Sequence, residues 1–440
     1  MAESKQDQTK ILSKNLFPVV GIGASAGGLE AFKKLVKAIP VDSGIAYILV
    51  QHLHPDHSSA LPEILQRETR VPVSEISDNV KVEPNHVYVI PANKLLVATD
   101  GILQLSPRPS RDQKNMPIDI FFTSLAEVHQ SHAIGVVLSG NGADGTLGLK
   151  SIKENGGITF AEDLGSAAYD SMPQNAINAG VVDFILSPEN MPGELLKLNN
   201  TFNILPSGDN AIPVALTEEE SFKQIFSLLR LNNGVDFTYY KQSTIRRRVL
   251  RRMIICKLES IADYLILLKQ NKPEQDTLFQ DILIPVTSFF RDPTMFDTIC
   301  ETVLPELIEN KSSVNPLRIW VAGCSTGQEA YSIAMCIYEY LSDKISTVRV
   351  QIFATDISEK SIQRARLSIY NKSEMEGLSE GRIRDFFTKT NGNYQVKKII
   401  RDMCVFARHN FLKDPPFAKL DMISCRNVLI YLEPFLQKKA

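Results

Sequence analysis

The chain has 440 residues, of which 44% are hydrophobic and 22% charged, and its formal net charge is -2. This length exceeds one ordinary hydrophobic core and predicts two or three domains. A charge this close to zero argues against a dominant polyanion-binding surface, so nucleic acid is not an expected partner. The polar N-terminus has no apolar signal core, and no apolar run approaches the ~20 residues that cross a bilayer. The six cysteines form no CxxC pair, which is typical of reduced thiols in a cytoplasmic protein.

The first half of the chain alternates predicted strands with predicted helices. Strands are expected at 17–22, 45–50 and 133–138, and helices at 29–38 and 117–130. Strands that alternate with helices are typical of a parallel, doubly wound α/β sheet. We therefore expect an α/β domain over residues 16–198.

The second half begins with a change of composition. Residues 199–215 contain two prolines and a glycine among polar residues, which favours a linker. Helical periodicity dominates 216–285 and predicts an all-α subdomain. Predicted strands return at 317–321, 348–353 and 420–424, so residues 286–440 are expected to form a Rossmann-like α/β domain.

A glycine-rich turn follows the first predicted strand. Its segment Gly23–Gly27 reads GASAG, which matches the G-x-S-x-G turn that exposes a nucleophilic serine, here Ser25, at a sheet edge. The overlapping pattern from Gly21 also matches a dinucleotide-binding fingerprint, which requires an acidic residue after the next strand. That strand ends in Gln51-His52, so the nucleophile is the favoured interpretation.

A base and an orienting carboxylate are available for this serine. His52 ends the second predicted strand, and neighbouring parallel strands bring their carboxyl ends to the same edge of a sheet. Asp144 lies in a second glycine-rich turn, 140–145, where it can orient the imidazole and stabilise its protonated form. The sequence thus predicts a Ser25–His52–Asp144 triad.

A metal site is the alternative for the same segment. His52, His54, Asp56 and His57 form an H-x-H-x-D-H run, whose density of imidazoles can bind zinc. This alternative, a metal-dependent hydrolase, leaves Ser25 without a role. We expect no metal but keep the alternative open.

The second half carries a cofactor pattern and a basic helix. A turn of small residues that includes Gly323 follows a predicted strand, and Asp356 ends the next strand, where a carboxylate can accept hydrogen bonds from ribose hydroxyls. The segment TIRRRVLRRM places two arginine pairs four residues apart on a helix, giving a basic face that either docks an acidic helix or is solvated. Its candidate substrate-binding residues are Arg247, Arg248, Arg251 and Arg252.

Five motifs of the first half resemble the catalytic domain of the chemotaxis receptor methylesterase, CheB. They are GIGASAGG, the QH after the second strand, MPIDIFF, SGNGADG and SMPQNAINAG, and they span about residues 16–195. The resemblance implies that Ser25 is the nucleophile, His52 the base and Asp144 the orienter. The implied substrate is a γ-glutamyl methyl ester on a chemoreceptor helix. The chain has Ala26 and Asn141 where that family commonly has threonine and methionine.

The second half resembles the chemotaxis receptor methyltransferase, CheR, from about residue 217 to the end. The resemblance rests on the two segments above, on VTSFFRDP and RHNF, and on CRNVLIY. It implies S-adenosylmethionine as cofactor, with Arg291 and Tyr431 near the methyl-transfer centre. The implied cofactor contacts are Thr287, Arg291, Gly323, Glu329, Asp356, Asn410 and Asn427. The family fold continues with further strands, so the methyltransferase domain is expected to be incomplete at Ala440.

These observations predict a bifunctional bacterial enzyme that both hydrolyses and forms methyl esters of protein glutamate. The expected partners are the acidic helical region of a methyl-accepting chemoreceptor and the proteins of a histidine-kinase and response-regulator phosphorelay. A methylesterase whose C-terminal half only binds cofactor or acts as a scaffold is a second alternative.

Overall fold

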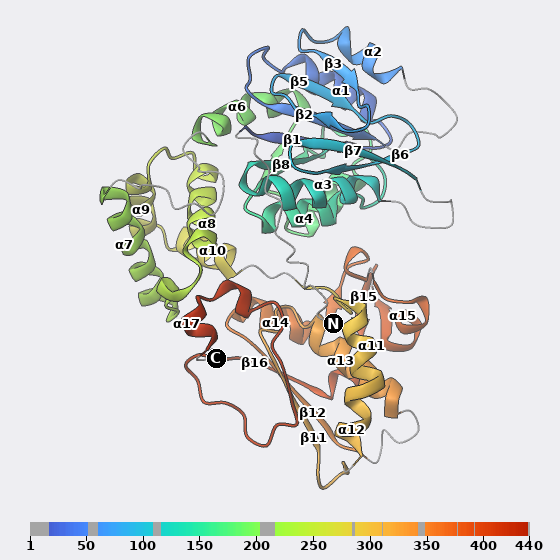
Figure 1. Ribbon diagram of the computed structural model, residues 1–440, viewed down its shortest axis with the longest axis vertical. Coiled ribbons are helices and arrows are strands. Elements are labelled where there is room, and N and C mark those ends of the chain that lie inside the picture. The colour runs from blue at the N-terminus through green and yellow to red at the C-terminus, as the bar shows by residue number, and fades with distance from the viewer. Residues whose placement is uncertain are drawn as a thin grey trace, which may run out of the picture. The chain divides into compact units, whose positions relative to one another are not determined.

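The computed structural model describes residues 17–51, 60–108, 116–202, 216–283, 287–309, 311–341, 348–375, 377–390 and 392–438. The chain forms two compact units, Met1–Leu228 with Arg246–Glu274 and Leu229–Ile245 with Gln275–Ala440. Each unit contains a parallel sheet with helices packed against it (Figure 1), which confirms the expected α/β class. No helix in the described part is long and apolar enough to cross a membrane.

The first unit is built on a seven-stranded sheet with strand order β10-β9-β8-β1-β2-β5-β3. Every neighbouring pair in it is parallel. The strands are β1 (Val19–Ala24), β2 (Ala46–Gln51), β3 (Val73–Glu75), β5 (His86–Val89), β8 (Ala133–Val137), β9 (Ile158–Glu162) and β10 (Phe184–Leu186). The chain leaves β1 toward β2 on one side and later returns to β8 on the other. The carboxyl ends of β1 and β8 therefore form a topological switch point, where ligands of such sheets bind.

The two faces of this sheet are both buried, as the alternation along β2 shows. Tyr47 and Leu49 pack with α1 (Gly28–Lys37) and α6 (Met191–Phe202). Ile48 and Val50 pack with α3 (Pro117–His129), α4 (Thr146–Glu154) and α5 (Ser171–Asn178). Burial on both faces gives the expected doubly wound domain. The unit also contains α2 (Leu61–Gln66) and an antiparallel sheet of β4 (Val80–Lys81), β6 (Lys94–Ala98) and β7 (Ile102–Pro107).

Four helices follow, as the periodicity predicted. They are α7 (Leu216–Asn233), α8 (Gln242–Ile255), α9 (Ile261–Gln270) and α10 (Lys272–Leu283). Ser260 caps α9, because its hydroxyl oxygen accepts a hydrogen bond from the Asp263 amide at 3.1 Å. The boundary between the two units passes through α7, α8 and α10. Helix α6 continues to Phe202, so the expected linker at 199–215 is helical at its start, and residues 203–215 lie outside the described part.

The second unit is built on a four-stranded sheet with order β16-β12-β11-β17, again parallel throughout. Its strands are β11 (Leu317–Ala322), β12 (Val350–Asp356), β16 (Cys404–Arg408) and β17 (Met422–Ser424). The buried core combines strand residues such as Ile319 and Val321 with Ile333 and Ile337 of α13 (Gln328–Leu341). The other elements are α11 (Pro293–Thr298), α12 (Leu304–Ile308), α14 (Glu359–Leu367), α15 (Glu380–Phe386), α16 (Lys398–Arg401), α17 (Pro434–Gln437) and a small sheet of β13 (Ile369–Tyr370), β14 (Phe387–Thr390) and β15 (Asn393–Val396).

Candidate active sites

Ser25 directly follows β1 and stands in the sharp turn that leads into α1. The turn is closed by the amide of Gly28, which donates to the Ser25 carbonyl oxygen at 3.0 Å. Gly27 has a φ of 75°, and a Cβ there would lie 2.7 Å from the Ser139 hydroxyl oxygen. Only glycine fits that backbone conformation and that space without strain. The glycines of the motif therefore build the strand–turn–helix geometry of a nucleophile elbow.

The turn after β8 lies against the turn that carries Ser25. The Ser25 amide donates to the Ser139 carbonyl oxygen at 3.0 Å. A Cβ on Gly140 would come within 2.9 Å of the Ser25 Cβ and 2.1 Å of the Met172 sulfur. Such close approach requires glycine at residue 140. The two glycine-rich turns thus meet at the switch point of the sheet.

Asp144 sits in this second turn and is 3% exposed. Its two carboxylate oxygens accept hydrogen bonds from the amides of Ile118 at 3.1 Å and Asp119 at 2.9 Å. These amides belong to the first turn of α3, where unpaired N–H groups and the helix dipole attract an anion. The helix end therefore fixes the orientation of the Asp144 carboxylate at the same sheet edge as Ser25.

His52, the expected base, lies outside the described residues. The same is true of His54, Asp56 and His57, so the structure does not test the metal alternative. Among the residues that the structure does describe, no group of three or more His, Cys, Asp or Glu side chains is arranged to hold a metal. The triad stays a prediction, with Ser25 and Asp144 at one edge of the sheet.

Glu162, at the end of β9, was not anticipated from the sequence. It is 1% exposed, and its carboxylate accepts a hydrogen bond from the Ser139 amide at 2.7 Å. Burial raises the pKa of Glu162 above its ordinary value, although the Ser139 amide and the Ser166 hydroxyl favour the ionised form. Glu162 therefore fixes Ser139, whose carbonyl oxygen in turn accepts the hydrogen bond from the Ser25 amide. The available signal was a carboxylate at the carboxyl end of a buried strand.

The segment 166–175 also forms hydrogen bonds with the turn after β8. The Ser139 hydroxyl donates to the Ala26 carbonyl oxygen at 2.9 Å and accepts from the Tyr169 amide at 2.9 Å. The Asn175 side chain donates to the Gly142 carbonyl oxygen at 2.7 Å. Asn141, which stands where the CheB family commonly has methionine, is exposed. The backbone of the turn is thus fixed from both sides.

The second unit contains an open cavity with about 1000 Å³ of empty space. Five predicted residues line it together: Gly323, Asp356, Asn410, Asn427 and Tyr431. The other lining residues are Tyr240, Lys241, Thr244, Ile245, Ile282, Leu283, Ser325, Ile357, Ser361, His409, Phe411, Arg426 and Val428. Thr287, Arg291 and Glu329 are not among the described residues that line it. Its lining combines apolar side chains with a few polar groups, which is typical of small-molecule sites.

Asp356 connects the two turns that border this cavity. Its carboxylate accepts hydrogen bonds from the amides of Ser325 at 2.9 Å and Ser358 at 2.8 Å. Burial raises the pKa of Asp356 although these amides favour the carboxylate. Gly323 has a φ of 75°, and a Cβ there would lie 2.3 Å from a Val428 methyl carbon, so the turn needs glycine.

Arg426 contacts Arg291 and Glu329, two of the predicted residues that do not line the cavity. Its guanidinium donates to the Arg291 carbonyl oxygen at 2.6 Å and lies 3.7 Å from a Glu329 carboxylate oxygen. The Ser424 hydroxyl donates to Glu329 at 2.6 Å. Burial raises the pKa of Glu329, while Ser424 and Arg426 favour the ionised form. Arg426 was not anticipated, although it follows the predicted strand that ends at 424.

The polar groups around the cavity fit a cofactor that carries hydroxyl and amino groups. Three buried atoms there, Ser325 Oγ, His409 Nδ1 and Arg426 Nη1, have no hydrogen-bond partner among the described residues. Buried polar atoms are normally paired, so these atoms suit a polar ligand. The Asp356 carboxylate adds a hydrogen-bond acceptor to the cavity lining. The donor set thus agrees with S-adenosylmethionine.

The four arginines of the basic helix lie on α8, where two of them are buried. Arg248 is 3% exposed and Arg251 is 1% exposed. Arg247, Arg248 and Arg251 contact residues of the sheet domain of the first unit. Arg252 instead pairs with Glu274 of α10, its Nη2 atom lying 2.7 Å from the carboxylate.

Comparison with known proteins identifies the families of both halves of the chain. Residues 20–195 match the family model "CheB methylesterase", residues 220–283 match "CheR methyltransferase, all-alpha domain" and residues 285–440 match "CheR methyltransferase, SAM binding domain". A Leptospira interrogans protein named for protein-glutamate methylesterase and protein-glutamine glutaminase activities is 33% identical over 42% of this chain and 95% of its own length. A chemotaxis protein methyltransferase of Listeria monocytogenes is 32% identical over 48% of this chain and 79% of its own length. The chain belongs to the CheB and CheR families.

One relative aligns with most of this CheB–CheR chain. An uncharacterized 104.1 kDa protein of Rhodobacter capsulatus is 34% identical over 399 residues, which is 86% of this chain. The matched part is 42% of that relative, so the chain spans less than half of its length. Along this chain the family models match in the order methylesterase, all-alpha domain and SAM binding domain.

Proposed function

We propose that this chain both removes and adds methyl esters on glutamate residues of a chemoreceptor. The observation that carries the proposal is the contact between Ser25 in its elbow and the turn that contains Asp144. The polar cavity beside Asp356 supports the second activity. We place the methylesterase domain at 16–198, the linker at 199–215, the helical subdomain at 216–285 and the methyltransferase domain at 286–440.

The hydrolytic reaction uses Ser25 as nucleophile. Its hydroxyl oxygen attacks the ester carbonyl carbon while His52 takes the hydroxyl proton, and Asp144 stabilises the imidazolium that forms. His52 then gives that proton to the leaving methoxide, so that methanol departs and an acyl-enzyme remains. A water molecule, deprotonated by His52, attacks this ester; His52 then returns the proton to the Ser25 oxygen as the acyl bond breaks, which releases the glutamate and restores the enzyme. Backbone N–H groups of the two fixed turns stabilise the oxyanion, so Ala26 and Asn141 are compatible with activity.

The methylation reaction uses S-adenosylmethionine, which supplies an electrophilic methyl group. We propose cofactor contacts from Thr287, Arg291, Gly323, Glu329, Asp356, Asn410 and Asn427. Asp356 accepts hydrogen bonds from ribose hydroxyls, and Gly323 allows the backbone to approach the cofactor closely. Arg291 and Tyr431 orient the substrate carboxylate, which is already a nucleophile. Positioning therefore contributes more than a strong base would.

The proposed partner is the acidic helical region of a methyl-accepting chemoreceptor in the bacterial cytoplasm, within a histidine-kinase and response-regulator pathway. The arginines of α8 supply complementary charge for such a helix. Joining both activities in one chain keeps them near the same receptor.

Methyl transfer is tested with S-adenosylmethionine labelled in its methyl group and a glutamate-containing receptor fragment. The proposal predicts base-labile label on the receptor glutamates, and no label when Asp356→Ala replaces the wild type. Cofactor binding without transfer to any receptor fragment would instead support the non-catalytic alternative for the C-terminal half.

A further inference from the structure

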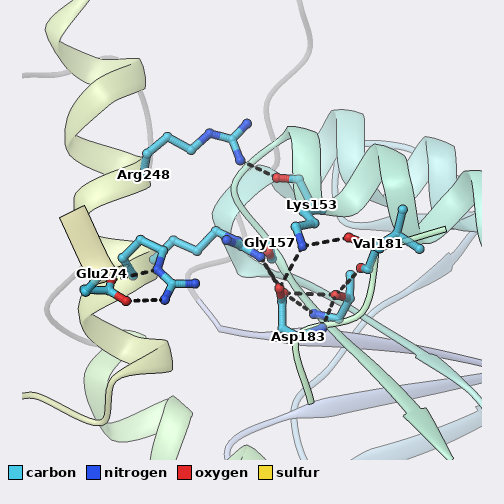
Figure 2. Close-up of polar contacts among 10 residues, drawn as sticks. Lys153, Gly157, Val181, Asp183, Arg248 and Glu274 are labelled. Atoms are coloured by element: carbon cyan, nitrogen blue, oxygen red, sulfur yellow. Dashed lines mark hydrogen bonds and ion pairs between the residues drawn. The ribbon is translucent and has the colours of Figure 1, made fainter. Parts of the chain in front are cut away.

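The arginine helix α8 contacts the methylesterase sheet at the amino ends of its strands. Arg251 pairs with Asp183, the residue before β10, at 2.5 Å, and the two side chains are 1% and 4% exposed. The Arg251 Nε atom also donates to the carbonyl oxygen of Gly157, the residue before β9, at 3.0 Å. Figure 2 shows several of these interactions converging on Asp183. The buried Arg251 guanidinium thus pairs with the Asp183 carboxylate and also donates a hydrogen bond to the Gly157 carbonyl oxygen.

Arg248 makes a second polar contact one turn earlier on α8. Its guanidinium donates to the carbonyl oxygens of Lys153 and Glu154, and Figure 2 shows the side chain directed toward Lys153. These carbonyls end α4, where unpaired acceptors and the negative end of the helix dipole attract a cation. Arg247 donates to the Gln130 side chain, just beyond α3. We call the set Lys153, Glu154, Gly157 and Asp183 the Asp183 surface.

Apolar and charged contacts beyond the arginines extend the interface. Ile254 of α8 is 2% exposed and belongs to the core cluster that α1 and α6 share with the sheet. Lys257, just after α8, pairs with Glu194 of α6 at 2.8 Å. An interface that combines buried apolar area with paired charges is typical of specific docking.

Asp183 does not depend on α8 for all of its partners. Its carboxylate accepts hydrogen bonds from the Thr159 amide at 3.1 Å and hydroxyl at 2.9 Å, and it lies 3.2 Å from the Lys153 ammonium. Burial alone would raise the pKa of Asp183, but the charges of Arg251 and Lys153 outweigh burial and hold it below its ordinary value. Asp183 therefore has partners within the methylesterase domain in addition to Arg251.

Other arginines of α8 point to their own helical subdomain and provide an internal comparison. Arg252 pairs with Glu274 of α10, and Arg246 pairs with Glu219 of α7. Two arginines of α8, Arg246 and Arg252, thus contact neighbouring helices, whereas Arg248 and Arg251 contact the Asp183 surface.

We propose that the Asp183 surface is a docking site for α8, and that the docked helix withholds Arg248 and Arg251 from an acidic partner. This inference rests on the proposed function, in which these arginines bind a chemoreceptor helix. Ser25 lies at the carboxyl ends of the parallel strands, and the five residues of β9 span about 16 Å. Docking therefore covers the α8 arginines Arg248 and Arg251 while leaving the esterase site accessible.

Hydrogen exchange followed by mass spectrometry on the full chain tests the docking. Asp183→Asn and Arg251→Ala are each expected to accelerate exchange in α8 and at residues 156–160 by at least about tenfold. The double variant should exchange no faster than the faster single variant, because both substitutions remove one contact. Arg252→Ala is the matched control, expected to loosen the helical subdomain without changing residues 156–160. Unchanged α8 exchange in both single variants would overturn the docking.

Competition is tested with a fluorescent helical peptide rich in glutamate. Asp183→Asn should lower its apparent Kd, because more of the chain then has α8 free to bind. If exchange in α8 has risen in a variant but its Kd for the peptide is unchanged, the proposed competition between the Asp183 surface and an acidic helix for α8 is overturned. An absence of peptide binding in every variant also overturns it. Methanol release and labelled methyl transfer are measured on the same samples, so failure of the proposed function is seen separately.

Discussion

The amide of Ser25 donates to the carbonyl oxygen of Ser139 at 3.0 Å, which joins the turn after β1 to the turn after β8. The same Ser139 offers its own amide to the buried carboxylate of Glu162 at 2.7 Å. The position of the nucleophile is therefore determined by two successive hydrogen bonds that link residues following or ending three strands of the sheet. Substitutions that disturb these hydrogen bonds should reduce hydrolysis without touching the substrate.

Gly140→Ala should damage the esterase site directly. A Cβ at this position would lie 2.1 Å from the Met172 sulfur and 2.9 Å from the Ser25 Cβ, so either the turn or Ser25 must move. Crowding of this kind costs about 1–3 kcal/mol of stability. We expect methanol release to fall at least tenfold, roughly the effect of a misplaced reacting group. Gly193→Ala, in a helix with open space around the new Cβ, is the control and should be neutral or stabilising.

Glu162→Leu should destabilise the esterase domain by about 1–3 kcal/mol, because the buried Ser139 amide loses its acceptor. Glu162→Gln keeps an acceptor and should preserve most of the methanol release. Thermal unfolding and the ester assay measure both effects. Equal stability of the leucine variant and the wild type would contradict this role of Glu162.

The pH dependence of unfolding should also distinguish Glu162 from glutamine. The pKa of Glu162 is raised in the folded protein above its ordinary value of 4.5, mainly by burial. The contribution of Glu162 to the free energy of unfolding is fully present below the pKa that this carboxyl has in the unfolded chain. It is lost as the pH rises through the higher pKa of the folded protein. The wild type should therefore lose stability relative to Glu162→Gln as pH increases from 4.5, and the difference should level off above the folded pKa. A difference that is constant with pH would contradict the raised pKa.

Asp356→Ala should weaken S-adenosylmethionine binding at least about tenfold, through loss of charged hydrogen bonds. It also leaves the amides of Ser325 and Ser358 without their acceptor. Because burial raises the pKa of Asp356, wild-type affinity should begin to fall at a higher pH than for an ordinary aspartate as the solution is acidified. Isothermal calorimetry measures both effects. Asp385→Ala, at a side chain that is 55% exposed, is the control and should bind normally.

The sequence predicted the parts of the fold that repeat local patterns. Buried strands such as 45–50 and helices such as 29–38 lie within one or two residues of the observed bounds, because hydrophobic periodicity and glycine-rich turns are local signals. Strands β9, β10 and β16 were not anticipated. Strand β9 is buried at every position and so shows no alternation, while β10 and β16 are edge strands of three and five residues, too short for a clear periodic signal.

The candidate site residues also fall into those with a local sequence signal and those without one. Ser25, Asp144 and Gly323 could be placed in turns that follow strands, and Asp356 at the end of a strand, because these are local sequence patterns. Glu162 could not, since its role depends on β9 lying next to β8, a long-range relationship. Likewise, spacing on α8 indicated a basic face, but it could not indicate that Arg251 meets Asp183, 68 residues away in sequence.

The most direct test is methanol release from a peptide that carries a γ-glutamyl methyl ester, measured for the wild type, for Ser25→Ala and for the wild type with EDTA. The account predicts release by the wild type that survives EDTA and falls by at least about a thousandfold in Ser25→Ala. Release that EDTA abolishes and Ser25→Ala retains would contradict the serine mechanism and assign the chemistry to the His52–His57 segment.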